Sequence, residues 1–307
     1  MTTTTPSNRH ALIGVICTLT GAIGFSLKPV LVKAAYLHGI DPVSLLMLRM
    51  LFSAPFFALM AVWAGPPDPS VSAKDWRGVI CLGFLGYYLG SYLDLAGLQW
   101  VSAGFGRLVL YLYPTLVVLL PWIFLRHRLR GRELLALALT YGGIALVFRV
   151  ELGAEHDTQK TAWGASLVFA GALTYATYLV AGSRLVHRFG STRFAAYASL
   201  VATGFVLAHF TLLRPVSALR GPLELYGVIL ILAVAATVLP VWLMAEGLRH
   251  IGANRVSLIA CVGPVATMAF ATVFLGESIS LSQLAGAILV LTGVVVISWK
   301  VPTASNT

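Results

Sequence analysis

Charged residues are scarce in this 307-residue chain: 10% of its residues are Asp, Glu, Lys or Arg, whereas 58% are hydrophobic. Soluble globular domains carry about 25% charged residues. A chain with so few charges cannot cover a surface that faces water, so most of its surroundings must be lipid. The composition therefore indicates an integral membrane protein and excludes a sizeable soluble domain.

Cysteine is also rare, and the common nucleotide-binding and hydrolase motifs are missing. The three cysteines, Cys17, Cys81 and Cys261, lie in apolar runs, and an odd number at such positions gives neither a disulfide framework nor metal-ligand spacing. The sequence contains no Gly-x-x-x-x-Gly-Lys-Ser/Thr, Gly-x-Ser-x-Gly or His-Glu-x-x-His. We therefore expect no metal site, no cofactor and no ATP-driven pump.

Long apolar runs fill the chain. A bilayer is spanned by a helix of about 20 apolar residues, whereas a barrel strand needs only about ten. Ten runs near the helical length are present, and we take the first as an uncleaved helix because nine more follow it. They predict an all-α membrane protein with ten transmembrane helices, at roughly 11–32, 43–64, 78–98, 101–125, 133–150, 163–182, 194–213, 223–246, 253–275 and 282–299.

The net charge of +10 comes from short basic clusters between these runs. If the N-terminus is cytoplasmic, the cytoplasmic connections hold 13 Lys and Arg residues and the outer ones hold 5. Positive residues accumulate on the cytoplasmic side of membrane proteins. The pattern therefore predicts a multi-pass protein of the inner or plasma membrane with both termini in the cytoplasm, and it gives no indication of a nucleic-acid partner.

The sequence repeats itself at a constant offset of 150 residues. Five spans in each half is an odd number, which places the second half upside down relative to the first. The loop 124–132 carries four arginines, whereas its counterpart 274–282 carries no basic residue and one acid, Glu277. We therefore predict two repeats of inverted topology, 11–150 and 161–300, a plan common among secondary transporters. The matched glycines and prolines are Gly14 with Gly164, Gly21 with Gly171, Gly97 with Gly247, Pro114 with Pro264 and Gly143 with Gly293.

Both halves end in segments, 97–148 and 247–298, that resemble the EamA-like repeats of the drug/metabolite transporter (DMT) superfamily. The shared motifs are an opening glycine, a proline within the fourth helix, a Leu-Gly-Glu exit and a glycine-rich fifth helix. Residues 275–277 match that exit, whereas the first half departs from it and reads Leu-Arg-His at 125–127. The resemblance implies a basket of ten helices with cytoplasmic termini that exports or exchanges small organic solutes.

Ionisable residues inside spans are costly and are therefore candidates for function. Four of them, Lys28, Arg49, Asp94 and Arg107, lie in four predicted helices at similar depth in the outer part of the first half. One carboxylate among three cations leaves an excess of positive charge, which a substrate carboxylate or phosphate would balance. The alternative is that these side chains reach toward the interface or pair with one another as a structural network.

Helix four offers a further set of candidates. Arg107, Tyr111 and Pro114 recur at i, i+4 and i+7 and so share one helical face. Pro114 and Pro264 each free a backbone carbonyl in corresponding helices, and interrupted helices at corresponding positions indicate a transport site. A tolerated kink is the simpler alternative.

Tyrosines and two acids complete the candidate site. Tyr87 shares a face with Asp94, and Tyr175 lies deep in its predicted span, where a phenol can stack on a solute. The alternative is an interfacial aromatic belt. Asp94 and Glu246 lie near opposite mouths and are candidates for gates or for binding a coupling proton, although Glu246 can instead pair with Arg249.

We therefore predict a secondary transporter that moves a small metabolite, such as an amino acid or another carboxylate-bearing solute, by alternating access. Its partners are that solute and the lipid bilayer. A channel, a non-transporting membrane partner and an intramembrane enzyme are the alternatives; Asp94 is the single acid well inside a predicted span, whereas two-aspartate proteolysis needs two. Gly86 and Gly90 form a Gly-x-x-x-Gly pair that permits close helix packing, within the chain or in a homodimer.

Overall fold

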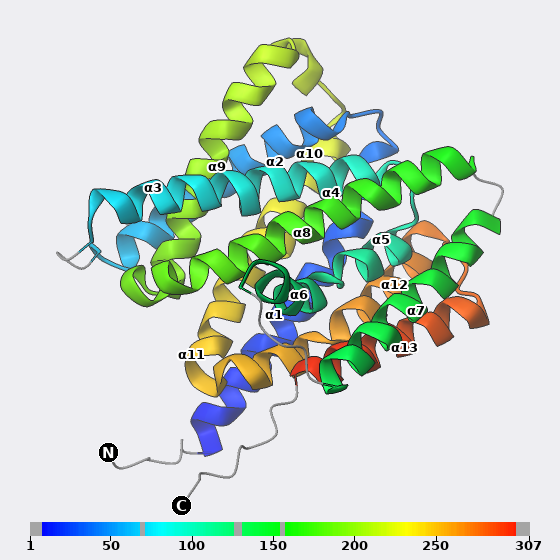
Figure 1. Ribbon diagram of the computed structural model, residues 1–307. Coiled ribbons are helices and arrows are strands. Elements are labelled where there is room, and N and C mark those ends of the chain that lie inside the picture. The colour runs from blue at the N-terminus through cyan, green and yellow to red at the C-terminus, as the bar shows by residue number, and fades with distance from the viewer. Residues whose placement is uncertain (1–7, 68–70, 126–130, 154–156, 299–307) are drawn as a thin grey trace, which may run out of the picture.

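The computed structural model describes residues 8–67, 71–125, 131–153 and 157–298, and all regular structure within these ranges is helical. Ten of its helical stretches are long and apolar enough to span a membrane, which confirms the predicted fold class (Figure 1). The helices are α1 (Asn8–Tyr36), α2 (Pro42–Trp63), α3 (Ala73–Leu82), α4 (Gly90–Leu98), α5 (Ala103–Leu110), α6 (Tyr113–Leu125), α7 (Gly131–Gly153), α8 (Thr158–Phe189), α9 (Ser191–Leu213), α10 (Leu223–Ala233), α11 (Leu239–Ala260), α12 (Val262–Leu275) and α13 (Leu281–Ser298), with π-helical segments η1 (Gly83–Leu89) and η3 (Val234–Val238) and a short 3-10 helix η2 (Val216–Leu219).

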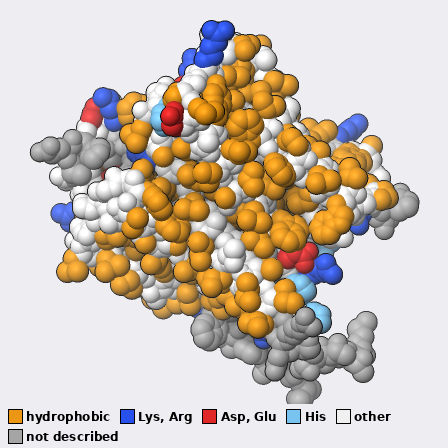
Figure 2. Space-filling view, turned by 180° about the vertical axis from the view of Figure 1, so that it is seen from behind, with side chains coloured by type: hydrophobic (Ala, Val, Ile, Leu, Met, Phe, Trp, Pro, Cys, Tyr) orange, Lys and Arg blue, Asp and Glu red, His pale blue; other side chains and the backbone are white. Residues whose placement is uncertain are grey.

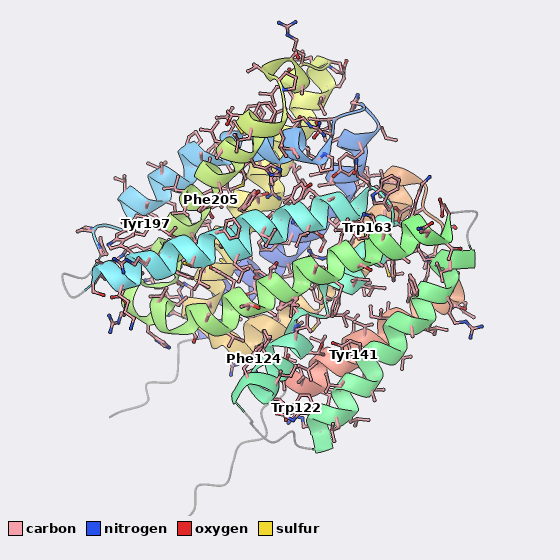
Figure 3. All side chains as sticks on the ribbon, turned by 45° about the horizontal axis from the view of Figure 1, so that its top comes forward. Trp122, Phe124, Tyr141, Trp163, Tyr197 and Phe205 are labelled. Carbon is pink, nitrogen blue, oxygen red and sulfur yellow. The ribbon has the colours of Figure 1, made fainter. Side chains whose placement is uncertain are left out.

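The outer surface of the bundle is apolar. Figure 2 shows hydrophobic side chains over most of the visible face, with charged side chains toward its margins. Many large apolar side chains are exposed, and Leu212, for example, is 81% exposed. Figure 3 shows Trp122 and Phe124 toward one end of the bundle and Trp163 toward the other, as expected for aromatic belts at two membrane interfaces. This surface requires lipid around it.

The two halves of the chain interlock. We call the end of the bundle where α1 begins the near end, and the opposite end, where α2 begins, the far end. In Figure 1, α4 and α8 run side by side across the front of the bundle. At the 150-residue offset, α4 corresponds to α11 and α8 corresponds to α1, and α1 and α11 also pack on each other. In addition, α2 packs on α9, and α7 packs on α13. Helices far apart in sequence therefore enclose the centre together.

Helix interruptions recur at the offset seen in the sequence. Shifting η1 by 150 residues gives 233–239, the interval that contains η3. The break between α5 and α6 lies at 111–112, and the break between α11 and α12 lies at Cys261. Ser102, which caps α5, corresponds to Gly252, where α11 is kinked. Gly252 has a φ of +76°, a backbone conformation that glycine adopts without a steric penalty.

The Gly-x-x-x-Gly pair is used inside the chain. A Cβ atom added at Gly86 would lie 2.5 Å from the ring of Tyr178, and one added at Gly90 would lie 2.8 Å from the hydroxyl of Thr174. Both neighbours belong to α8, so the two glycines let the η1–α4 span approach α8 closely. This close approach lets side chains of α4 and α8 border the same central space.

Helices α2 and α9 are joined at both ends. At the far end, Arg214 Nε donates to Asp41 Oδ1 at 3.2 Å, and at the near end Arg193 donates to the carbonyl oxygen of Pro66 at 2.6 Å. Partial burial opposes ionisation of Asp41, but hydrogen bonds from Ser44 and Arg214 outweigh it and lower the pKa of its carboxyl group. Asp41 also caps the first turn of α2. We call this pair of end contacts the α2–α9 clasps.

Several predicted boundaries need correction. Helix α1 continues to Tyr36, so Lys33, which was predicted to lie in a loop, belongs to the last turn of the helix. Helix α8 continues to Phe189, so Arg188 is helical as well. In both cases basic residues stand in the last turn, where they interact favourably with the helix dipole and with free carbonyl groups. Arg126, Arg128 and Arg130 lie outside the described residues.

Candidate functional site

A central cavity of about 200 Å³ lies within the helix bundle. It is smaller than the roughly 300–1,000 Å³ typical of sites for drug-sized ligands, which suits a small metabolite. All seven residues that the sequence suggested for substrate contact line it: Lys28, Arg49, Tyr87, Asp94, Arg107, Tyr111 and Tyr175. They come from α1, α2, η1, α4, α5, the α5–α6 break and α8, so that the packing described above brings five separate spans to one space.

Lys28 and Asp94 form an ion pair across the cavity wall. Lys28 Nζ donates to Asp94 Oδ2 at 2.8 Å, and the two side chains are 14% and 6% exposed. The pair joins α1 to α4 on the side of the cavity toward the far end. Beyond it, Val32 and Leu95 are completely buried. Apolar side chains are therefore tightly packed next to the ion pair on this side of the cavity.

Arg49 is a buried residue of α2. It lies in the second turn of α2, which Asp41 caps and Pro42 begins, and its side chain is buried. Its Nε atom has no hydrogen-bond partner among the described residues, and an amino group lies 3.8 Å from the sulfur of Met50. Sulfur is a weak acceptor. The guanidinium group thus borders the cavity, and no carboxylate in the described ranges forms an ion pair with it.

Arg107 lies on α5, a helix of only eight residues. Its guanidinium carbon is 5.1 Å from the centre of the Tyr111 ring, and its Nε atom has no hydrogen-bond partner in the part of the chain that the structure describes. The Tyr111 hydroxyl donates to the carbonyl oxygen of Ala260, next to the break between α11 and α12. The Tyr111 ring thus contacts Arg107 of the first half, and its hydroxyl contacts Ala260 of the second half. Tyr111 therefore connects the two helix breaks.

Pro114 and Pro264 do not line the cavity. Each stands in the first turn of the helix that follows an interruption: Pro114 near the start of α6 and Pro264 near the start of α12. A proline is well accommodated there because the first amide groups of a helix have no partner within it. Both prolines therefore follow a helix break by two or three residues, and the cavity is lined by Tyr111, within the first break, and by Ala260, just before the second.

Tyrosine rings form another part of the wall. Tyr175 meets Tyr113 edge to face, with ring centres 5.1 Å apart, and Tyr87 meets Tyr178 in the same way at 5.3 Å. Tyr175 and Tyr178 stack at 5.9 Å. Such pairs hold the rings in fixed orientations. The cavity thus combines cationic groups with rigid aromatic surface.

The second half contributes neutral residues that the sequence reasoning missed. Thr237 and Met244 line the cavity, and they stand 150 residues after Tyr87 and Asp94. The repeat offset was the signal that could have identified them. Glu246 is not among the lining residues; it lies near Arg249 and His250, at 3.5 and 3.6 Å.

Two acidic side chains hold the start of α5, and neither role was foreseen. Glu277 accepts hydrogen bonds from the backbone amides of Ala103 and Gly104, at 2.8 and 3.3 Å. Glu151 accepts from the amide and hydroxyl of Ser102, at 2.6 and 2.9 Å. Negative charge is favourable at a helix N-terminus. Arg107 therefore lies on a short helix whose N-terminus is fixed by Glu151 of α7 and by Glu277 of the Leu-Gly-Glu segment.

Within the described ranges, the His, Cys, Asp and Glu side chains form no group that could hold a metal ion. His209 instead contacts the hydroxyl of Tyr88, with Nδ1 2.9 Å from the oxygen, and its ring packs on Tyr92. These residues lie outside the cavity lining. The arrangement in the cavity can bind an anion through cations and rings, and its helix breaks supply points at which the spans can change direction.

Comparison with known proteins agrees with this architecture. The chain is 32% identical to the uncharacterized transporter YcbK of Bacillus subtilis (strain 168), over 93% of each chain. It is 25% identical to the uncharacterized inner membrane transporter YicL of Salmonella typhimurium, over 83% of this chain and 84% of the other. One solved crystal structure superposes with a TM-score of 0.65 at 16% identity, covering 92% of this chain and 95% of the other, which shows a shared fold.

The family comparison covers nearly the whole chain. Residues 12–149 and 162–299 each match the EamA-like transporter family, part of the DMT superfamily. The two matched segments include every residue that lines the cavity. With ten helices long and apolar enough to span a membrane, a central cavity bordered by four ionisable side chains, and transporter relatives along nearly its whole length, the chain is a multi-pass membrane transporter and belongs to the EamA-like transporter family.

Proposed function

We propose that this protein is a secondary transporter that carries a small organic anion, bearing a carboxylate or a phosphate, by alternating access. The observation that carries the proposal is the central cavity, in which Lys28, Arg49 and Arg107 face one carboxylate, Asp94. Buried cations inside a membrane bundle mark substrate pathways. An anionic group on the solute would meet these cations, while the tyrosine rings contact its carbon skeleton.

The arrangement of the helices supports alternating access. Apolar side chains pack next to the ion pair on the far-end side of the cavity, and breaks at equivalent positions in the two halves give each half a point of bending. Two inverted repeats, 11–150 and 161–300, would exchange their conformations during the cycle. The excess of Lys and Arg in the near-end connections supports a cytoplasmic near end, and export or exchange of metabolites from there.

The proposal is tested in proteoliposomes loaded with a mixture of cellular metabolites. Their efflux is compared with that of protein-free vesicles by mass spectrometry, with and without a proton gradient or a counter-substrate outside. Selective, saturable exit of anionic solutes is the expected result. If no solute leaves under any of these conditions, the transport proposal is wrong and a non-transporting membrane role replaces it.

A variant links any flux to the cavity. Arg107→Gln keeps a polar side chain of similar length but removes the charge, and we expect a loss of anion flux of at least about tenfold because a buried charged hydrogen bond is lost. Arg149→Gln removes the same charge from an exposed position on α7 and is the matched control. Unchanged flux in a well-inserted Arg107→Gln protein would contradict the proposed substrate contact.

A further inference from the structure

The net charge of the cavity does not depend on where the proton of its ion pair resides. Lys28 and Asp94 are bound to each other at 2.8 Å. The pair is neutral as ammonium and carboxylate, and it is equally neutral if the proton moves to the carboxylate. Arginine, in contrast, stays protonated in proteins. The two guanidinium groups of Arg49 and Arg107 therefore give the side chains that line the cavity a net charge of two positive charges.

Both guanidinium groups are buried and form no ion pair with a carboxylate of the described residues. Arg49 is 3% exposed and Arg107 is 7% exposed. Among the ion pairs found in the described parts of the chain, none involves either side chain. Within the described residues both Nε atoms lack an acceptor, while Arg49 contacts the sulfur of Met50 and Arg107 contacts the ring of Tyr111. An unpaired buried charge is strongly unfavourable, so a counter-charge is needed in the cavity.

The two arginines belong to different helices, α2 and α5, and both line the same cavity of about 200 Å³. We infer that the solute carries two negative charges, as a short dicarboxylate or a phosphate monoester. This inference rests on the proposed function and narrows its substrate class. A dicarboxylate and a phosphate monoester both carry two negative charges on oxygen atoms, and guanidinium groups bind such carboxylate and phosphate groups well.

The test measures binding to the purified full-length protein in lipid nanodiscs by isothermal titration calorimetry. The probes are the dicarboxylates from malonate to adipate, each compared with its monoamide, which has nearly the same shape and one charge fewer. Ethyl phosphate is compared with ethyl sulfate, which has nearly the same shape and carries one negative charge. We expect at least one doubly charged probe to bind about tenfold or more tightly than its singly charged partner, at one probe per protein.

Three results would overturn the inference. Equal affinity for a monoamide and its dicarboxylate would show that one charge suffices, and the proposed anion transport would stand. Binding of two singly charged probes per protein would show that the arginines take separate monoanions, again without harm to the proposed transport. Absence of binding by every probe would contradict the doubly charged substrate, and absence of anion flux in the proteoliposome assay is the separate result that refutes transport.

Variants of Arg49 test whether this side chain binds the second negative charge of the probe. Arg49→Gln should lower the preference for the doubly charged probe to less than about threefold while binding of the monoamide persists, because one of two attractive charges is gone. Arg49→Lys retains the charge and should retain the preference. Arg149→Gln, outside the cavity, should leave all affinities unchanged. If Arg49→Gln fails to insert, the ligand panel on the wild-type protein still decides the question.

Discussion

Two adjacent glycines on α7 allow the helix packing of this bundle to be tested by substitution. A Cβ atom added at Gly143 would lie 2.6 Å from the carbonyl oxygen of Gly286 on α13 and 2.9 Å from the Cβ atom of Leu289. A Cβ atom added at Gly142 would have no neighbour within 4 Å. The first position is a contact between two backbones, whereas the second is open, and both are helical.

Opposing terms determine the effect at Gly143. Ordinary contact begins near 3.4 Å, so the two helices must separate by several tenths of an ångström, and such overpacking costs about 1–3 kcal/mol. Alanine gains about 0.5–1 kcal/mol over glycine in a helix. Gly142→Ala receives the same gain without the clash. The difference in free energy of unfolding between the two variants therefore isolates the contact and should be about 1–3 kcal/mol.

The measurement is unfolding in mixed micelles with a rising fraction of denaturing detergent, followed by tryptophan fluorescence. We expect Gly142→Ala to match or exceed the wild type in stability and Gly143→Ala to fall below both. Equal stability of the two alanine variants would refute the close approach of α7 and α13. A less stable Gly142→Ala protein would show that α7 presents a different face to its partner.

Two further predictions use the same unfolding measurement. Glu277→Ala should lower the free energy of unfolding by about 1–2 kcal/mol because the amides of Ala103 and its neighbour lose their acceptor; Glu224→Ala, at an exposed position, is the control, and equal effects of the two would contradict the capping role. Lys28→Met and Asp94→Asn should each destabilise by about 3–5 kcal/mol, and the double variant by clearly less than their sum, because each single change leaves an unpaired buried group; additive losses would show that the two groups act independently.

Sequence reasoning was strongest where lipid imposes the pattern. The length and apolarity of each run were enough to predict ten spans, because a helix in a membrane must satisfy its own backbone groups. Lys28, Arg49, Asp94 and Arg107 were identified as candidates by the cost of a charge in a span. The structure brings all four to one cavity, and whether they bind a solute stays a prediction.

Other features depend on distances that no sequence pattern reports. Nothing in the residues of η1 predicts a π-helical segment, which arises where a span must fit its neighbours. Glu277 was seen as part of a motif, but its bonds to α5 join residues more than 170 positions apart. Glu246 was preferred over Met244 because an acid attracts attention, yet Met244 occupies the equivalent of Asp94 in the cavity.

The α2–α9 clasps have a practical consequence for following this protein at work. Alternation of access requires some helices to move while others provide a fixed frame, and α2 and α9 are bound to each other at both ends. A pair of spin labels with one label on each of these helices should report one distance, with or without solute. A second pair of labels would stand on α2 and on α6, the helix that follows the break at 111–112. The distance between these two labels should change during the transport cycle.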